Sequence, residues 1–433
     1  MIGQLLLGLS ILVGLHELGH LVAAKMFGMR VEKYSIGFPP KVFGFMWRGT
    51  EYSLGAIPLG GFVKISGMVD ESMDKEQMKL PPQPWEFRSK PAWQRLVVMM
   101  GGIVVNVITG IVIYSMMAYH YGESYLPARE ARYGIVAHEL AQELGLQTGD
   151  KILNINGKGY DRFSDVASPD LLLGNNGFYT IERNGQVITV KIPNNFIETL
   201  GNMREKRQFI DEITPFSVGD VSPGYPAAKA GLKKGDKILN VNNQPIQFFH
   251  ELQAVLAANK NKAVPIKLER GGQQIETRAT ITPEGLLGFK PVSELKYEQL
   301  RYGLGESFAR GSVMAFDVVW LNIKGFGKIF RGEVSAKNAV SGPIAMAQDL
   351  YGGIWDWQNF WRITGLLSMI LAFMNFLPIP ALDGGHVMFL TYEIVARRKL
   401  SDKFLENAQK VGMVLLLSLM AFAVFNDVFK RIM

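Results

Sequence analysis

Residues 2–26 read IGQLLLGLSILVGLHELGHLVAAKM, an apolar stretch interrupted by two histidines and a glutamate. About 20 such residues, rising ~1.5 Å each in a helix, are enough to cross the hydrocarbon core of a bilayer. Ionisable side chains at that depth are unfavourable, and their default interpretation is functional. The stretch therefore predicts a membrane-spanning helix that carries chemistry at His16, Glu17 and His20.

The composition of the whole chain predicts a protein that is partly membrane-embedded and partly globular. Its 433 residues are 48% hydrophobic with a mean hydropathy of +0.10, too apolar for an ordinary soluble enzyme and too polar for a pure helix bundle. Cysteine is absent, which excludes disulfides and thiolate ligands, so any metal must be held by histidine and carboxylate. The net charge of +7 comes from dispersed cations beside apolar stretches, and we do not expect a nucleic-acid-binding protein.

Four stretches are long and apolar enough to span a membrane: residues 2–26, 96–120, 361–392 (interrupted by Pro378 and Pro380) and 411–429. Lysine and arginine concentrate between the first and second stretches and at 397–403, between the third and fourth. Since basic loops stay on the cytoplasmic side, the termini and residues 121–350 are predicted to face the periplasm. The first stretch is long and lacks a preceding basic segment, so we do not expect a cleaved signal peptide.

The middle segment contains an internal repeat. GLQTGDKILNINGKGYDRF at 145–163 matches GLKKGDKILNVNNQPIQFF at 231–249 through a shared Gly-Asp turn and a short strand. The pattern resembles the PDZ domain, and two tandem copies would fill residues 121–205 and 206–290. Two unrelated hairpins with similar turns are the alternative, but the match is long for turns alone. PDZ domains take an extended peptide at a sheet edge; whether these copies bind ligands or only exclude bulky proteins stays open.

Residues 306–331 have an amphipathic helical pattern within a predicted membrane-associated region, 291–350. One face is apolar and the opposite face is polar, so the segment as a whole is less apolar than the predicted spans. This favours a helix that lies in the membrane–water interface or packs on the bundle over a fifth span. The apolar face comprises Phe316, Val319, Trp320, Ile323, Phe326 and Phe330.

His16 and His20 are spaced for a shared metal ion. Four residues apart on a helix, both imidazoles project from one face, close enough for metal bonds of ~2.0–2.1 Å. Glu17 is rotated by about 100° and would not be a ligand, but it can reach a water on the same metal and accept its proton. The alternative is a chance HExxH, or core histidines bonded to other helices. With six histidines in 433 residues, chance is a poor explanation.

A catalytic zinc usually has a third protein ligand, and Asp383 in NFLPIPALDGGH (375–386) is our candidate. It is a carboxylate inside an apolar span, where irregular backbone is tolerated only if protein or a water-filled cavity covers it. His16 and Asp383 both fall in the inner half of the membrane, so their depths allow contact. The alternative is that Asp383 belongs to a helix-ending turn, as Asp-Gly-Gly often does.

HExxH in the first span, NFLPIPALDGG in a later span and PDZ-like repeats between them resemble the site-2 protease family of intramembrane zinc metalloproteases, in its bacterial regulator-of-sigma-E branch. The resemblance covers essentially the whole chain. It implies that His16, His20 and Asp383 bind zinc and that Glu17 is the general base. It also implies that Asn375 contacts the substrate backbone or steadies the oxyanion, although Asn375 could instead be a structural amide between helices.

Residues 50–65, TEYSLGAIPLGGFVKI, look non-helical. In the resembled family this region is a hairpin that re-enters the membrane and offers a strand edge to substrate, which would make Gly60, Gly61 and Phe62 substrate-binding residues. The alternative is a cytoplasmic β-turn packed on the bundle. SGPIAMAQ at 341–348 also matches a family segment, without a chemistry that we can assign. VVNVITG in the second span is predicted to pack helices through its small residues.

These observations predict a polytopic α-helical membrane protein with four transmembrane helices, two tandem periplasmic PDZ domains (α+β) and a membrane-associated β-hairpin region. Residues 1–120 hold the first two transmembrane helices and the β region, and 351–433 hold the last two. The predicted function is an intramembrane zinc endopeptidase of a Gram-negative inner membrane that cuts single-span proteins within their transmembrane segments. The resemblance implies anti-sigma-factor substrates and signal-peptide remnants, and we expect a monomer in the lipid bilayer. A metal transporter and a PDZ-based membrane scaffold are the alternatives.

Overall fold

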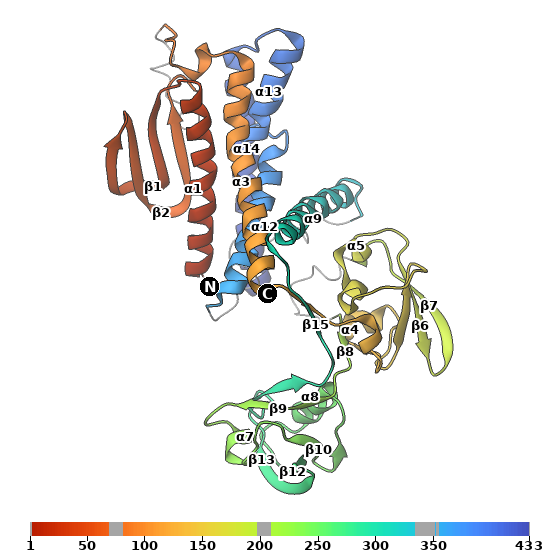
Figure 1. Cartoon of the computed structure of the whole chain (residues 1–433). Coiled ribbons are helices and arrows are strands. Elements are labelled where there is room, and N and C mark those ends of the chain that lie inside the picture. Colours follow the sequence, from red (N-terminus) through yellow and green to blue (C-terminus); the bar gives the residue numbers. More distant parts are fainter. Residues whose placement is uncertain (1, 69–80, 197–208, 334–350, 352–354, 433) are drawn as a thin grey trace. The chain divides into compact units, whose positions relative to one another are not determined.

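The computed structural model describes residues 2–68, 81–196, 209–333, 351 and 355–432. The chain forms two compact units, one from residues 1–123 with 301–433 and the other from 124–300 (Figure 1). The first unit contains long helices and one sheet, and the second contains short strands and helices. The segment 341–348, singled out in the sequence, lies outside the described residues.

The first unit is built on apolar helices. They are α1 (Ile2–Met26), α3 (Ala92–Tyr121), α9 (Leu304–Phe330), α12 (Trp357–Phe376), α13 (Asp383–Ala396) and α14 (Asp402–Ile432). Within the described part of the chain, Gly3–Met26, Ala92–Tyr121 and Lys403–Ala423 are long and apolar enough to cross a membrane. They coincide with the first, second and fourth predicted spans, the last beginning earlier than expected. The protein is thus a membrane protein with several apolar helices.

The third predicted span, 361–392, is two helices rather than one. α12 ends at Phe376 and α13 begins at Asp383, and the prolines of the sequence motif lie between them. Proline lacks a backbone N–H and disfavours helical geometry in the residue before it. Leu377, which precedes Pro378, is accordingly extended (φ −63°, ψ 141°). The break places Asp383 at the first position of a helix. Whether α12 and α13 together cross the membrane stays a prediction.

α3 is packed backbone to backbone against α1. A Cβ atom on Gly19 would lie 2.3 Å from the carbonyl oxygen of Gly101, and one on Gly101 would lie 2.6 Å from that of Gly19. Small residues allow this approach, which is how helices in lipid gain contact. The same helix receives α12 at Gly110, where a Cβ would meet the sulfur of Met369 at 2.4 Å. α3 is therefore the central support of the unit.

The amphipathic segment forms the predicted helix, α9, and its bulky apolar face packs on protein only in part. Val319 packs on the cluster described next, and the ring of Phe326 lies 5.6 Å from that of Phe373 on α12. The small residues Gly311 and Ala315 of α9 are buried, and Ala315 belongs to a cluster with Tyr114 of α3 and Met369 of α12. Phe316, Trp320, Ile323 and Phe330 are all exposed. A helix that packs through a small-residue face and leaves aromatic side chains outward suits a location against lipid.

Two long bent strands, β1 (Val31–Trp47) and β2 (Thr50–Ile65), pair with each other to form one sheet. Residues 31–36 pair with 61–65 on one side and with 51–54 on the other, and 51–54 pair in turn with 43–46. Residues 61–65 are thus an outer edge: no strand among the described residues pairs with their other side. The opposite end of the sheet exposes Val42, Phe43, Phe45, Met46 and Trp47. The non-helical prediction for 50–65 is confirmed.

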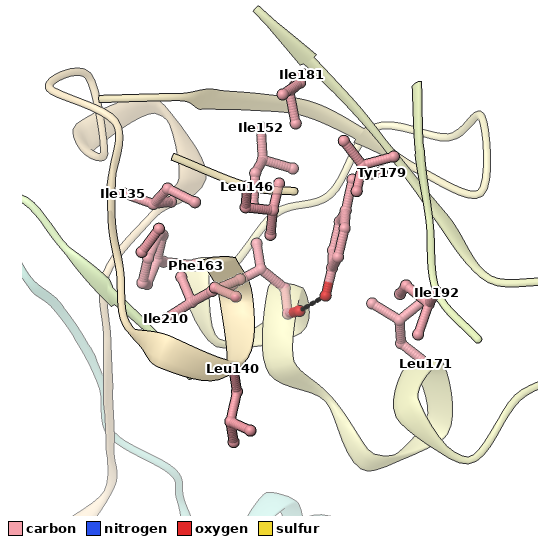
Figure 2. Close-up of a cluster of buried hydrophobic side chains, with 14 of the residues drawn as sticks. Ile135, Leu140, Leu146, Ile152, Phe163, Leu171, Tyr179, Ile181, Ile192 and Ile210 are labelled. Carbon is pink, nitrogen blue, oxygen red and sulfur yellow. Dashed lines mark hydrogen bonds between the residues drawn. The ribbon is translucent and has the colours of Figure 1, made fainter. Parts of the chain in front are cut away.

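The second unit contains both copies of the repeat, each with its own buried core. The first copy uses β4 (Ile135–Ala137), β5 (Lys151–Ile155), β6 (Phe178–Arg183) and β7 (Gln186–Lys191). The second uses β9 (Phe216–Val221), β10 (Lys237–Val241), β12 (Ala263–Arg270), β13 (Gln273–Thr280) and β14 (Phe289–Ser293). Tyr179 fills the first core, where its hydroxyl donates to the carbonyl of Val166 at 2.5 Å (Figure 2). The strands follow the Gly-Asp turns, as the sequence predicts.

Each copy contains an equivalent ion pair between a buried aspartate and an arginine. Asp150 accepts from Arg183 at 2.7 Å, and Asp236 accepts from Arg270 at 2.7 Å. Burial raises the pKa of the Asp236 carboxyl, but the hydrogen bond and charge of Arg270, together with the backbone N–H and charge of Lys233, outweigh burial and hold the pKa below its ordinary value. In both copies the arginine also donates to the glycine that opens the repeat motif, Gly145 or Gly231. The sequence repeat is thus a repeat of structure.

The strands cross the boundaries that the sequence suggested for the two copies. β8 (Ile210–Glu212) lies beyond residue 205 yet pairs with β4 of the first copy. β14 runs past residue 290 and pairs with β9 of the second copy. A short strand offers too few residues for a sequence pattern to show which neighbour it joins.

Candidate metal centre

The two histidines of the HExxH motif converge on one point. They lie one turn apart on α1, and their Nε2 atoms are 3.3 Å from each other. The side chains are 12% and 6% exposed for His16 and His20 respectively. The helix therefore presents both rings on one face, as the four-residue spacing predicts.

Asp383 completes the cluster from the other end of the chain. Its Oδ2 atom lies 3.1 Å from Nε2 of His16 and 3.3 Å from Nε2 of His20. The turn before α13 aims the carboxylate here, and it leaves no space for side chains on the next two residues. A Cβ on Gly384 would lie 2.1 Å from the carbonyl oxygen of Leu377, and one on Gly385 would lie 2.6 Å from that of Ile379.

The three atoms fit a tetrahedral metal ion. Ligands about 2.0–2.1 Å from a tetrahedral zinc lie roughly 3.3 Å from one another, and the observed separations are 3.1 to 3.3 Å. Two imidazole nitrogens and one carboxylate oxygen are a usual donor set for catalytic zinc, which keeps a fourth position open. Within the described residues, this is the group of side chains that could hold a metal ion.

α3 orients both imidazoles from behind. The carbonyl oxygen of Val98 lies 2.8 Å from Nδ1 of His20, so that Nδ1 donates and Nε2 keeps its lone pair toward the cluster. The amide of Asn106 lies 3.2 Å from Nδ1 of His16. Between them, Gly102 gives the rings room, because a Cβ there would lie 2.5 Å from Nε2 of His20. α3 thus packs its backbone at Gly102 against the two imidazoles and makes one polar contact with each of them.

The cluster opens into a cavity of about 380 Å³. Glu17, the predicted proton acceptor for water, lines this cavity together with the two histidines. Asn375, at the end of α12, also lines it, and its Nδ2 atom lies 3.4 Å from Nε2 of His16. The predicted base and an amide therefore line the same cavity as the three predicted ligands.

The predicted substrate-binding residues divide into two groups. Gly61 and Phe62, on the edge segment of β2, line the cavity, and a Cβ on Gly61 would lie 3.6 Å from Cγ of Glu17. Gly60 is not among the described residues that line the cavity. It packs on Phe38, whose ring a Cβ would approach to 2.4 Å.

Sequence reasoning missed the residues of α3 and α13 around the cluster. Asn106 was attributed to helix packing within VVNVITG, and Gly102 and His386 were not considered. His386 lines the cavity one turn after Asp383. A signal was available for Asn106, since an amide in the middle of an apolar span needs a polar partner. No pattern pointed to Gly102, because its role depends on what packs against it.

Comparison with known proteins agrees with this geometry. The family model described as peptidase family M50 matches residues 4–419. The chain belongs to peptidase family M50. A Haemophilus influenzae M50 relative named regulator of sigma E protease is 30% identical, with 98% of each chain covered. The Salmonella typhimurium regulator of sigma-E protease RseP is 27% identical over 98% of this chain and 97% of that protein.

A Vibrio cholerae protein whose name describes a zinc metalloprotease is 29% identical, with 98% of this chain and 97% of that protein covered. M50, the site-2 protease family, is zinc-dependent. This M50 chain is accordingly a zinc metalloprotease of the membrane, and the resemblance seen in the sequence is confirmed.

Proposed function

We propose that this M50 peptidase cleaves single-span membrane proteins within their transmembrane segments, with zinc held by His16, His20 and Asp383. The observation that carries the proposal is the cluster itself: three ligand atoms 3.1 to 3.3 Å apart, built on an apolar helix with Glu17 beside them. A site at that depth serves a substrate that is also in the membrane.

In this proposal each side chain around the cavity has a separate role in peptide hydrolysis. Bound zinc would supply Lewis acidity toward the substrate carbonyl and toward water. Glu17 accepts the proton of the attacking water and can return it to the departing amine. Asn375 offers an amide N–H to the substrate backbone or to the oxygen that gains charge. Each of these groups faces the same cavity, which is the geometric condition for a shared reaction.

A helical substrate must unwind before its peptide bonds can be cut, and the edge segment 61–65 offers a way to hold it. This segment pairs with 31–36 on one side, and Gly61 and Phe62 line the cavity. An extended peptide could pair with the other side, as in other cases of strand addition. The glycine at 61 keeps the strand close to Glu17, so a paired substrate would run past the predicted base.

Strand addition predicts a crosslinking pattern that alternates along the substrate. The chain has no cysteine, so Phe62→Cys adds a single thiol. In a Glu17→Gln background, which retains the uncut substrate, single-cysteine substrates should form disulfides with it at every second position, because side chains in a strand alternate. Oxidative crosslinking followed by gel analysis measures this.

Met46→Cys is the matched control, because Met46 is exposed on the opposite end of the sheet. We expect little crosslinking there. A period of three to four substrate residues at Phe62→Cys, or equal yields at both sites, would mean that the substrate is not bound as an added strand.

The remaining parts of the proposal concern location and partners. Basic residues between α1 and α3 and after α13 favour a cytoplasmic location for those loops. The two repeat copies would then be PDZ domains in the periplasm of a Gram-negative inner membrane. The names of the relatives favour an anti-sigma factor as substrate class. Periplasmic trimming of the substrate would come first, with the repeats excluding untrimmed proteins.

Incubation of the purified full chain with a single-span membrane protein tests the activity. We expect cleavage inside the apolar segment. A metal chelator should abolish it and added zinc should restore it, because the side chains of the site cannot supply the Lewis acidity of the metal. Mass spectrometry of the products gives the cut site. Cleavage that persists at full rate in chelator would contradict the proposal.

Two other outcomes would favour the alternatives. Zinc flux into reconstituted vesicles without any proteolysis would indicate a transporter. A cellular phenotype that survives Glu17→Gln unchanged would indicate a scaffold. The presence of Glu17 in the same cavity as the ligands, which neither alternative uses, is the observation that favours the protease.

A further inference from the structure

The side chain of Asn106 is a buried amide in the middle of α3. It is 0% exposed, and its Nδ2 atom lies 3.2 Å from Nδ1 of His16. Burying an amide in an apolar setting is unfavourable unless it is hydrogen-bonded. The imidazole of His16 meets this need for Nδ2 alone, and the contact joins α3 to one of the predicted ligands.

The backbone of Asn106 is held as firmly as its side chain. The hydroxyl of Ser368 on α12 donates to the carbonyl oxygen of Asn106 at 2.8 Å, and Ser368 is itself 0% exposed. A few residues before Asn106, Gly101 sets α3 directly against α1. The amide is therefore fixed relative to both neighbouring helices, which a side chain that orients a ligand requires.

The protonation of the His16 imidazole determines whether Oδ1 or Nδ2 of Asn106 should face its Nδ1 atom. If Nε2 of His16 binds a metal, the ring proton must sit on Nδ1, and Nδ1 then needs an acceptor. For His20, the carbonyl of Val98 is that acceptor. An asparagine can offer Oδ1 in the place of Nδ2, because a half-turn of the amide exchanges two atoms of similar size.

We propose that Asn106 is a positioning residue of the metal centre, whose Oδ1 accepts the Nδ1–H of His16 and so keeps Nε2 of that ring available to the metal. This rests on the proposed function, since it takes His16 as a ligand. With Nδ2 toward the ring, Nδ1 would be the acceptor and the proton would occupy Nε2, which blocks metal binding. Oδ1 is buried without a hydrogen-bond partner among the described residues, so turning the amide breaks no bond that Oδ1 makes.

Zinc affinity is the property that this role governs. We would measure it on the purified full chain by competition with a chromophoric chelator. Asn106→Leu keeps the size but removes the acceptor, and we expect affinity to fall by about 10- to 100-fold. Asn106→Asp keeps an acceptor at either end and is expected to stay within a few-fold of wild type. Asn106→Ala, which cannot clash, is measured beside Asn106→Leu and should show the same loss.

Two further variants make the outcome decisive. Asn322→Leu removes an amide on α9 that donates to the carbonyl of Val318 at 2.8 Å in its own helix, and it should leave zinc affinity unchanged. His16→Ala should abolish tight binding. Suppose that His16→Ala loses tight zinc binding while Asn106→Leu and Asn106→Ala both bind zinc normally. The inference about Asn106 is then overturned, and the proposed function stands. Equal losses in Asn106→Asp and Asn106→Leu would also overturn it, because packing would then explain both. Normal affinity in His16→Ala would overturn the proposed ligand set.

Discussion

Glu17→Gln is expected to abolish cleavage while zinc stays bound. Glutamine has the shape of glutamate but cannot accept a proton at neutral pH, and general-base catalysis is worth about 10²- to 10⁴-fold. Glu17 lines the cavity but is not part of the three-atom cluster, so its loss should not release the metal. Single-turnover cleavage of a single-span substrate gives the rate, and elemental analysis of the purified protein gives the zinc content.

His20→Ala is the matching variant, because it removes a proposed ligand atom instead of the proposed base. Its cleavage should fall to background together with its zinc content. If Glu17→Gln cut substrate at the wild-type rate, the base would have to be another group. If Glu17→Gln lost its zinc, Glu17 would have to be counted among the ligands.

Gly102→Ala should disable the enzyme through a single methyl group. The added Cβ would lie 2.5 Å from Nε2 of His20 and 2.6 Å from Cε1 of His16, which is closer than a Cβ atom approaches a non-bonded atom in real structures. Both rings would have to move, and misplacing catalytic groups by about 1 Å can cost 10²-fold in rate. We expect at least that loss, together with weaker zinc binding. Overpacking should also lower the free energy of unfolding by about 1–3 kcal/mol.

Gly325→Ala on α9 makes the same chemical change where a Cβ meets nothing within 4 Å. Alanine is favoured over glycine inside a helix by roughly 1 kcal/mol, so this variant should keep full activity and unfold at the same or a higher temperature. Wild-type activity and zinc affinity in Gly102→Ala would show that α3 does not press on the imidazoles as the structure indicates.

The parts of the site that follow from local geometry could be predicted from the sequence. The spacing of His16 and His20 places two rings on one face of any helix, whatever surrounds it. Asp383 could be found by elimination, since the chain lacks cysteine and few carboxylates occur at that membrane depth. The structure brings the three residues within contact distance, although their role as ligands remains our proposal.

The parts that depend on partners could not be predicted. Gly102 and Asn106 matter because α3 packs on α1 in one particular register, and a hydrophobic pattern does not give the register. β1 was not foreseen as the partner of β2, because only residues 50–65 were recognised as non-helical. The outward face of α9 reflects the same limit, since periodicity predicts which residues share a face but not what covers it.

The proposed metal centre is assembled from segments that are far apart in the sequence: 359 residues separate His16 from Asn375, and Asp383 comes later still. During synthesis the chain emerges from its amino end, so both imidazoles are in place long before the carboxylate has been translated. A nascent chain without α13 would therefore carry only two of the three proposed ligands. With Asp383 as the third ligand, the site would be complete only after α13 has docked beside α1.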